Sequence, residues 1–215
     1  MVMIRVVGIG PGDLHYGLLG QEAWFQEADL ILGSQRHLDT LPQNFRQKGQ
    51  VAPKKLADLK AYLHQQPEGR RIVFLVSGDP LVYGLGKWLT ENFPGQVLLE
   101  PGISSMQYLA SRLALPMNDA YLSSSHAKQP NFDFLLSLPK VFLVTDQQLG
   151  PYQIAQEVVK RGLRKTVVIG ENLSYPDEKV SISSAEQVED RPYKMNVVVI
   201  IDEGFAFFTN KSTND

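Results

Sequence analysis

Short, continuous apolar runs recur along the chain and alternate with segments of helical periodicity. Apolar runs of this length, without an alternating polar face, are typical of strands that are covered on both faces. The strands predicted from these runs are 4–9, 30–32, 72–76, 97–99, 141–144, 167–169 and 197–201.

The segments between these runs repeat apolar residues every three or four positions, which places them on one face of a helix. Four such faces are formed by Leu56, Leu59 and Leu63; by Leu85, Trp88, Leu89 and Phe93; by Met106, Leu109, Ala110 and Leu113; and by Ile154 and Val158. Strands that alternate with helices predict an α/β fold with mainly parallel strands.

A domain boundary is expected in LALPMNDAY, residues 113–121. Pro116 ends a preceding helix, and Asn118 with Asp119 suits a turn. We therefore expect an N-terminal α/β domain over 1–116, a C-terminal α/β domain over 117–208, and a polar tail over 209–215.

Charge and composition exclude several classes of function. The formal net charge is −2 and the isoelectric point is about 6.1, so the basic field that drives bulk nucleic-acid binding is missing. The chain has no cysteine, which excludes disulfides, thiolate metal sites and cysteine nucleophiles. Four scattered histidines show no paired ligand spacing, and we expect no metal site.

The N-terminal segment does not resemble a secretion signal, because Arg5 and Asp13 interrupt its apolar residues. The apolar run 197–201 is far too short to span a bilayer. We therefore expect a cytoplasmic protein that does not enter a membrane.

The first strand leads into GIGPGD, residues 8–13, which resembles a dinucleotide-binding loop only in part. Asp13 stands where the third glycine of that fingerprint belongs, and no acidic residue follows the second strand. A nucleotide-dependent oxidoreductase is therefore disfavoured. Pro11 and Gly12 predict a sharp turn, after which Asp13 caps a helix that begins at Leu14.

Two further strands end in loops rich in small residues. Ser77, Gly78, Asp79 and Pro80 follow the strand 72–76, and PGISS, residues 101–105, follows the strand 97–99. Because the carboxyl ends of parallel strands share one edge of a sheet, the three loops are expected to line one crevice.

The order GIGPGD, SGDPLVYG and PGISS resembles the tetrapyrrole methylase family, and the resemblance extends over residues 3–202. ENLSYPDE (171–178) and MNVVVII (195–201) fit the second domain of that family. Within it, GSQRHL (33–38) and ENLSYPDE are most similar to the branch that methylates C5 of precorrins. SSSHAKQ, 123–129, departs from the Ser-x-His-Gly-Arg stretch of that branch at Ala127 and Lys128.

The resemblance implies two α/β domains with largely parallel sheets and S-adenosylmethionine (SAM) bound in the trough between them. Cofactor contacts carried over by motif position are Pro11, Ser77, Gly78, Asp79, Val82, Ser104, Ser105, Thr145 and Leu173. From the residues alone, Asp79 could instead cap the helix after Pro80. Thr145 and Leu173 could instead pack in the core at a strand end.

The resemblance also implies the reaction, a C-methylation at C5 of a precorrin-6B macrocycle, with or without cobalt, in cobalamin (vitamin B12) biosynthesis. Arg36, His37 and Lys128 are expected to bind the acetate and propionate groups of this substrate. Asp13, Asp79 and His126 could accept the proton that the methylated carbon releases, and Asp13 and His126 are the candidates chosen as catalytic. Transfer itself requires no metal ion.

The resemblance further implies a homodimer, and a separate protein that carries out C15 methylation and decarboxylation is an expected partner. Two alternatives remain open. The chain could methylate another substrate of the family, such as a different precorrin position, uroporphyrinogen or the diphthamide precursor. It could also be a non-enzymatic supporting subunit, although the intact Gly78-Asp79-Pro80 loop argues against this.

Overall fold

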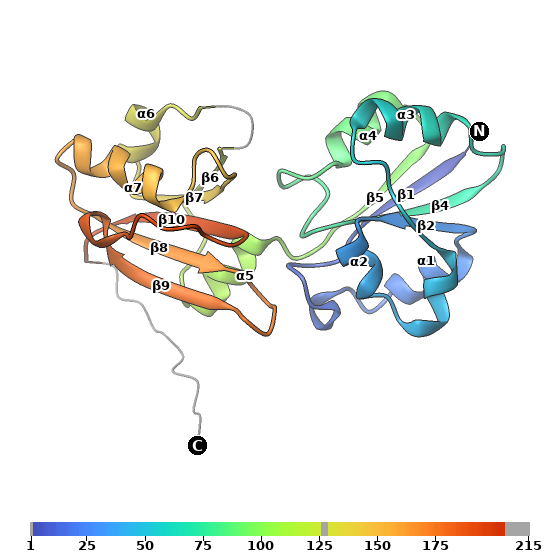
Figure 1. Cartoon of the computed structure of the whole chain (residues 1–215), viewed down its shortest axis with the longest axis horizontal. Coiled ribbons are helices and arrows are strands. Elements are labelled where there is room, and N and C mark those ends of the chain that lie inside the picture. The colour runs from blue at the N-terminus through green and yellow to red at the C-terminus, as the bar shows by residue number, and fades with distance from the viewer. Residues whose placement is uncertain (1, 126–128, 205–215) are drawn as a thin grey trace, which may run out of the picture. The chain divides into compact units, whose positions relative to one another are not determined.

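The computed structural model of the chain describes residues 2–125 and 129–204 (Figure 1). It consists of two compact units, Met1–Ser104 and Ser105–Asp215. The helix α5 (Ser105–Arg112) contacts strands of the second unit. The boundary expected after residue 116 lies beyond this helix and stays a prediction. His126 and Lys128 lie outside the described residues.

The first unit is built on a five-stranded sheet in which every pairing is parallel. Its strands are β1 (Met3–Gly8), β2 (Leu30–Gly33), β3 (Gly49–Val51), β4 (Arg71–Val76) and β5 (Val97–Glu100). Their order in the sheet is β3-β2-β4-β1-β5. The predicted parallel α/β architecture is confirmed for this unit.

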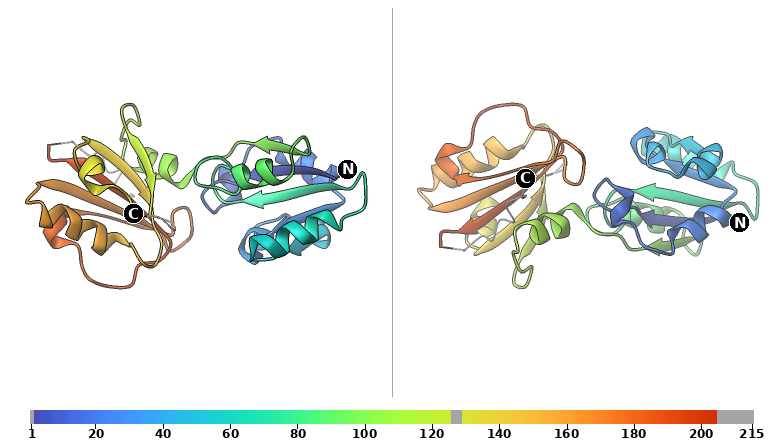
Figure 2. Two further views of the ribbon diagram at one scale, coloured as in Figure 1. Left: turned by 90° about the horizontal axis from the view of Figure 1, so that it is seen from above. Right: turned by 90° about the horizontal axis from the view of Figure 1, so that it is seen from below.

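Helices cover both faces of this sheet (Figures 1 and 2). The helices α3 (Leu56–His64) and α4 (Gly86–Asn92) cover one face, and α1 (Gln21–Glu27) and α2 (Gln35–Asp39) cover the other. Val6 of β1 packs in the core beneath α3 and α4, whereas Val7 packs in the core beneath α1 and α2. Burial on both faces explains why these strands are continuous apolar runs. Two short 3-10 helices, η1 (Leu14–Tyr16) and η2 (Gln43–Lys48), complete the unit.

The second unit contains a mixed sheet of five strands, in the order β6-β7-β10-β8-β9. These strands are β6 (Tyr121–Ser124), β7 (Lys140–Val144), β8 (Lys165–Glu171), β9 (Lys179–Ser184) and β10 (Asn196–Asp202). Only β6 and β7 pair in parallel, and β10 is antiparallel to both of its neighbours. The expectation of a largely parallel second sheet is therefore wrong. An apolar run indicates that a strand is buried on both faces. It does not indicate whether the strand pairs in parallel or antiparallel, because burial is the same in both cases.

The second sheet is also covered on both faces (Figure 1). Helices α6 (Phe132–Leu136) and α7 (Pro151–Lys160), with the 3-10 helix η3 (Ala185–Gln187), pack on one face around Val198 and Ile200 of β10. On the other face, Leu109 of α5 packs over Gly170 of β8.

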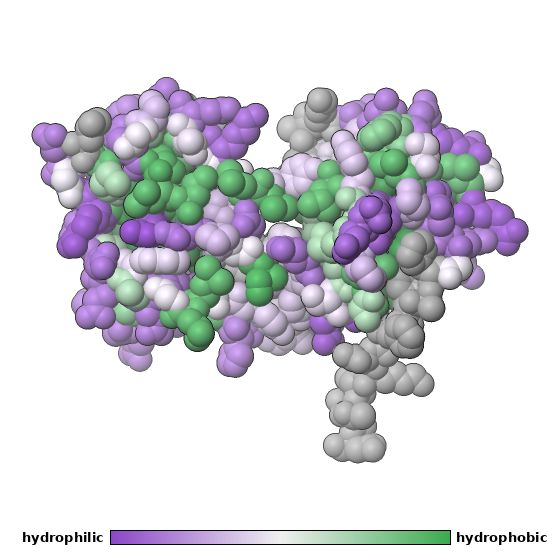
Figure 3. Space-filling view, turned by 180° about the vertical axis from the view of Figure 1, so that it is seen from behind, coloured by the Kyte–Doolittle hydropathy of each residue, from purple (hydrophilic) through white to green (hydrophobic). Residues whose placement is uncertain are grey.

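The surface of both units is mixed, with hydrophobic side chains exposed among hydrophilic ones (Figure 3). Leu19, Leu81 and Tyr83 are exposed on the first unit. Across the described ranges, every helix is too short or too polar to cross a bilayer.

Candidate functional site

Three loops meet at the carboxyl edge of the first sheet, where β1, β4 and β5 end. Gly78, which follows β4, donates its N–H to the carbonyl oxygen of Gly10, which follows β1, over 2.7 Å. A Cβ atom at Gly102 would lie 2.1 Å from the carbonyl oxygen of Gly78 and 2.7 Å from that of Gly8. Only glycine permits the three backbones to approach this closely. The predicted convergence of the loops is thus observed.

Asp79 ties the second loop to the third. Its Oδ1 accepts a hydrogen bond from the Leu81 N–H over 2.7 Å, and its Oδ2 accepts one from the Gly102 N–H over 3.2 Å. The next helix, α4, begins only at Gly86, so Asp79 closes the turn after Pro80 and does not cap a helix. The carboxylate is half-buried.

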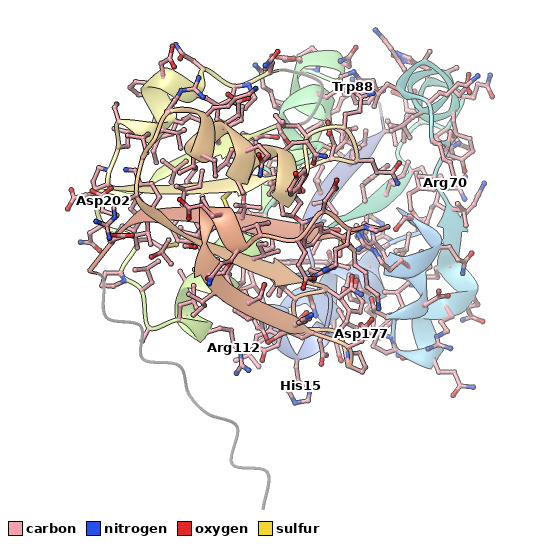
Figure 4. The ribbon with its side chains drawn as sticks, turned by 60° about the vertical axis from the view of Figure 1, so that its left-hand side comes forward. His15, Arg70, Trp88, Arg112, Asp177 and Asp202 are labelled. Atoms are coloured by element: carbon pink, nitrogen blue, oxygen red, sulfur yellow. The ribbon has the colours of Figure 1, made fainter. Side chains whose placement is uncertain are left out.

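In the first loop Pro11 is buried, and the loop ends at an exposed carboxylate, Asp13. Asp13 caps η1, as predicted, because its Oδ1 accepts a hydrogen bond from the His15 N–H over 2.9 Å. The side chain of His15 itself projects away from the ribbon (Figure 4). The exposed carboxylate of Asp13 remains the predicted proton acceptor of this loop.

Arg36 and His37, at the start of α2, both reach Ser77 at the end of β4. The Arg36 Nη2 donates to the Ser77 Oγ over 2.7 Å, and the His37 Nε2 lies 2.8 Å from the same oxygen. The other ring nitrogen, Nδ1, lies 3.2 Å from the carbonyl oxygen of Leu75. Burial, and then the nearby charge of Arg36, lower the pKa of His37 from 6.5 to about 4. His37 is therefore uncharged at neutral pH.

The remaining predicted contacts of the first half lie on these loops or at their ends. Val82 is half-buried and donates its N–H to the carbonyl oxygen of Asp79 over 3.3 Å. Ser104 is buried at the end of the first unit, and Ser105 opens α5. These positions were predicted from motif order, and their contact with a cofactor stays a prediction.

Thr145 follows β7 and is buried, with its Oγ1 donating to the Asn196 Oδ1 over 2.8 Å. It lines a cavity of about 520 Å³ in the second unit, together with residues such as Tyr193 and Asn196. The side chain of Leu173 is buried, and its Cδ2 would lie 2.8 Å from a Cβ atom added at Gly170. A cofactor contact for Leu173 would therefore use its backbone, and for both residues such a contact stays a prediction.

ENLSYPDE forms a loop that is held by hydrogen bonds from its own side chains. Asn172 and Ser174 adopt left-handed backbone conformations, with φ of 44° and 68°. The Asn172 side chain donates to Asp177, and Glu178 accepts from both the Ser174 N–H and Arg112. Arg112 and Asp177 are labelled in Figure 4. Left-handed conformations of this kind cost about 1–3 kcal/mol each and are frequent at ligand-binding loops.

The structure joins GSQRHL to the loop that follows β4, because Arg36 and His37 both contact Ser77. Sequence reasoning assigned Arg36 and His37 to a substrate and Ser77 to a cofactor, and it missed that these residues contact one another. Arg36 and His37 lie 41 and 40 residues before Ser77, so the sequence gives no local signal of these contacts.

Known proteins that are similar to this chain in sequence include tetrapyrrole methylases. The family model for tetrapyrrole (corrin/porphyrin) methylases matches residues 3–189. A cobalt-precorrin-7 C(5)-methyltransferase of Salmonella typhimurium is 38% identical over 94% of this chain and 100% of its own length.

Solved structures share the fold. A precorrin-6Y methylase of Archaeoglobus fulgidus superposes with a TM-score of 0.76 at 21% identity, covering 94% of this chain and 98% of its own. A uroporphyrin-III C-methyltransferase of Thermus thermophilus, solved with S-adenosylhomocysteine, gives 0.69 at 22% identity, covering 93% and 97%.

Proposed function

The chain belongs to the tetrapyrrole (corrin/porphyrin) methylase family, and on that premise we propose that it is a SAM-dependent C-methyltransferase that acts at C5 of a precorrin macrocycle in cobalamin biosynthesis. The observation that carries this proposal is the similarity to the Salmonella typhimurium C(5)-methyltransferase, which extends over that enzyme's full length. The motif stretches GSQRHL and ENLSYPDE, which favour the same branch, both lie in this matched region.

The three loops of the first unit fit the chemistry of SAM. That cofactor supplies an electrophilic methyl group and presents an ammonium, a carboxylate and ribose hydroxyls to its binding site. The loops offer the exposed hydroxyl of Ser77 and the half-buried carboxylate of Asp79, beside closely packed glycine backbone. Glycine backbone lets a ligand approach closely, and the carboxylate and hydroxyl oxygens accept its hydrogen bonds.

Arg36 is the proposed partner for a peripheral carboxylate of the macrocycle. Its guanidinium offers several hydrogen-bond donors in one plane, which matches the geometry of a carboxylate. His37 is neutral at physiological pH, so it brings no charge to such a contact. The attraction between Arg36 and a substrate carboxylate would orient the ring so that C5 faces the methyl group, and alignment of this kind accounts for much of the rate in transfer reactions.

Methylation of a carbon that carries hydrogen leaves one proton to be removed. The carboxylate of Asp13 is exposed at the end of the first loop, and one of its oxygens is engaged by the His15 N–H. Among the residues that the structure describes, we propose Asp13 as the acceptor of this proton. We also propose a cytoplasmic homodimer that cooperates with a separate C15-methylating, decarboxylating protein.

Titration calorimetry with S-adenosylhomocysteine tests the cofactor site. Mass spectrometry after incubation with SAM tests the reaction, with precorrin-6B and with cobalt-precorrin-7, the macrocycle in the name of the Salmonella typhimurium relative, as the two substrates. We expect saturable binding by the wild type. Asp79→Ala should bind S-adenosylhomocysteine at least about tenfold more weakly, because it removes the hydrogen bonds to the Leu81 and Gly102 N–H groups that hold the turn and the third loop. Glu91→Ala, which removes an exposed carboxylate from α4, serves as the control. A folded wild type that neither binds the cofactor product nor methylates the macrocycle would contradict the proposal and favour a supporting subunit.

A further inference from the structure

We propose that His37 is a positioning residue that holds the hydroxyl of Ser77 as a hydrogen-bond acceptor toward a donor group of bound SAM. The inference rests on the proposed function, since it assigns a task to a residue of the same site. It concerns how the site is organised before the ligand arrives, and it gives His37 a role other than contact with the substrate.

The neighbours of the imidazole fix its tautomer. The carbonyl oxygen of Leu75 can only accept a hydrogen bond, so the His37 Nδ1, 3.2 Å away, carries the proton. A neutral ring then has no proton on Nε2. Two donors converge on that atom, the Ser77 hydroxyl at 2.8 Å and the Arg36 Nη2 at 3.4 Å. Both contacts suit an unprotonated Nε2.

The tautomer in turn fixes the direction of the Ser77 hydroxyl. Its hydrogen points to the His37 Nε2, and one of its lone pairs accepts from the Arg36 Nη2 over 2.7 Å. A serine hydroxyl has one hydrogen and two acceptor positions. One acceptor position therefore remains for a ligand, while the donor is already used. Ser77 can thus receive a hydrogen bond from an ammonium or a ribose hydroxyl of SAM, but it cannot donate one to the cofactor's carboxylate.

The location of the pair supports this role. Ser77 is exposed at the carboxyl end of β4, directly before Gly78, whose N–H bonds to the first loop. His37 lies behind it on α2 and is anchored to β4 itself through Leu75. The imidazole therefore connects the helix to the strand that carries the cofactor loop. Rotation of the Ser77 hydroxyl would break its 2.8 Å hydrogen bond to the His37 Nε2.

Two substitutions distinguish the role of the His37 Nδ1 from that of the Nε2. The amide of His37→Asn can still donate to the Leu75 carbonyl, but it places no acceptor at the Nε2 position. The longer amide of His37→Gln can place an oxygen at that position and accept from Ser77. If His37 acts through Ser77, His37→Asn weakens binding of S-adenosylhomocysteine by about three- to tenfold, as Ser77→Ala does, and His37→Gln restores most of it.

The double variant His37→Asn/Ser77→Ala tests whether the two residues act as a pair. A positioning role predicts that the double variant binds no more weakly than Ser77→Ala alone, because the hydroxyl that His37 orients is already gone. Losses that multiply would overturn the proposal. His64→Asn, the same change near the amino edge of the sheet beside Val2, is the matched control and should bind as the wild type does.

The source of the donor is resolved with methylthioadenosine, which keeps the ribose but lacks the amino-acid part. Equal losses for both ligands in Ser77→Ala assign the donor to the ribose, and a loss confined to S-adenosylhomocysteine assigns it to the ammonium. A Ser77→Ala variant that binds both ligands as the wild type does would overturn the proposal.

Histidine nitrogen chemical shifts in the wild type, without ligand, provide a readout that does not depend on binding. The proposal requires a neutral His37 with its proton on Nδ1, and a proton on Nε2 would overturn it. Lack of cofactor-product binding by a folded wild type counts against the proposed function, whereas normal binding by His37→Asn counts against this inference alone.

Discussion

Replacing His37 with glutamine removes a group whose pKa is lowered from 6.5 to about 4 by burial and by the charge of Arg36. Because the folded protein resists protonation of this ring, the unfolded chain takes up the proton first as the pH falls. The resulting stability is fully present above pH 6.5 and is lost progressively as the pH falls toward 4.

The magnitude follows from the two pKa values of His37. At pH 7 the unfolded ring is mostly neutral, and the linked free energy is only a few tenths of a kcal/mol. At pH 5 the unfolded ring is almost fully protonated while the folded ring is not, which favours unfolding by about 2 kcal/mol. This is an upper figure, because the ring is partly exposed to solvent.

The assay is urea unfolding at pH 7 and pH 5, in wild type and in His37→Gln. Other groups titrate in both proteins, so the informative quantity is the change in unfolding free energy between the two pH values. We expect this change to be about 2 kcal/mol smaller in the variant, whatever its stability at pH 7. Gly20→Ala, which alters no titrating group, should keep the wild-type change. Equal changes in wild type and His37→Gln would refute the reasoning that His37 is held neutral.

Two further predictions concern stability. Gly102→Ala should cost about 3 kcal/mol or more in urea unfolding, because its Cβ would meet the backbone oxygen of another loop at 2.1 Å. Gly20→Ala, where no atom lies within 4 Å of the added carbon and φ is −83°, should change stability by less than about 1 kcal/mol, because alanine adopts this conformation without strain. Glu171→Gln should cost about 1–3 kcal/mol at pH 7, because this buried carboxylate accepts from Arg191 and from a backbone N–H. The exposed Glu189→Gln should cost far less, and similar losses in both would contradict this reading.

The strands that the apolar pattern left undetected share a place at the edge of a sheet. Each of the seven predicted runs corresponds to a strand with at least some buried or half-buried positions. The three strands it missed, β3, β6 and β9, all lie at a sheet edge. Their residues are largely exposed or half-buried. These three edge strands keep polar residues, so no apolar run marks them. The edge strand β5 was found because it carries the apolar run 97–99.

The short helices α1, α2 and α6 were also missed, and each has seven residues or fewer. Two turns of helix give few positions for a period to stand out. The equally short α4 was found because Leu85 and Phe93, at its two ends, extend the apolar repeat. The direction of β10 was missed for a different reason. Its central position between β7 and β8 buries both faces, and that burial produces the same apolar run in a parallel and an antiparallel pairing.

The strand order β3-β2-β4-β1-β5 explains the site of the first unit in a way that the motifs alone could not. The glycine-containing loops follow β1, β4 and β5, which are adjacent in the sheet, so parallel pairing brings the loops to one edge. GSQRHL follows β2, the other neighbour of β4, and the same geometry places His37 beside Ser77. Each motif specifies a local turn or helix start. The contact between His37 and Ser77 depends on β2 pairing with β4, and a chain with the same motifs on strands in another order would have no such pair.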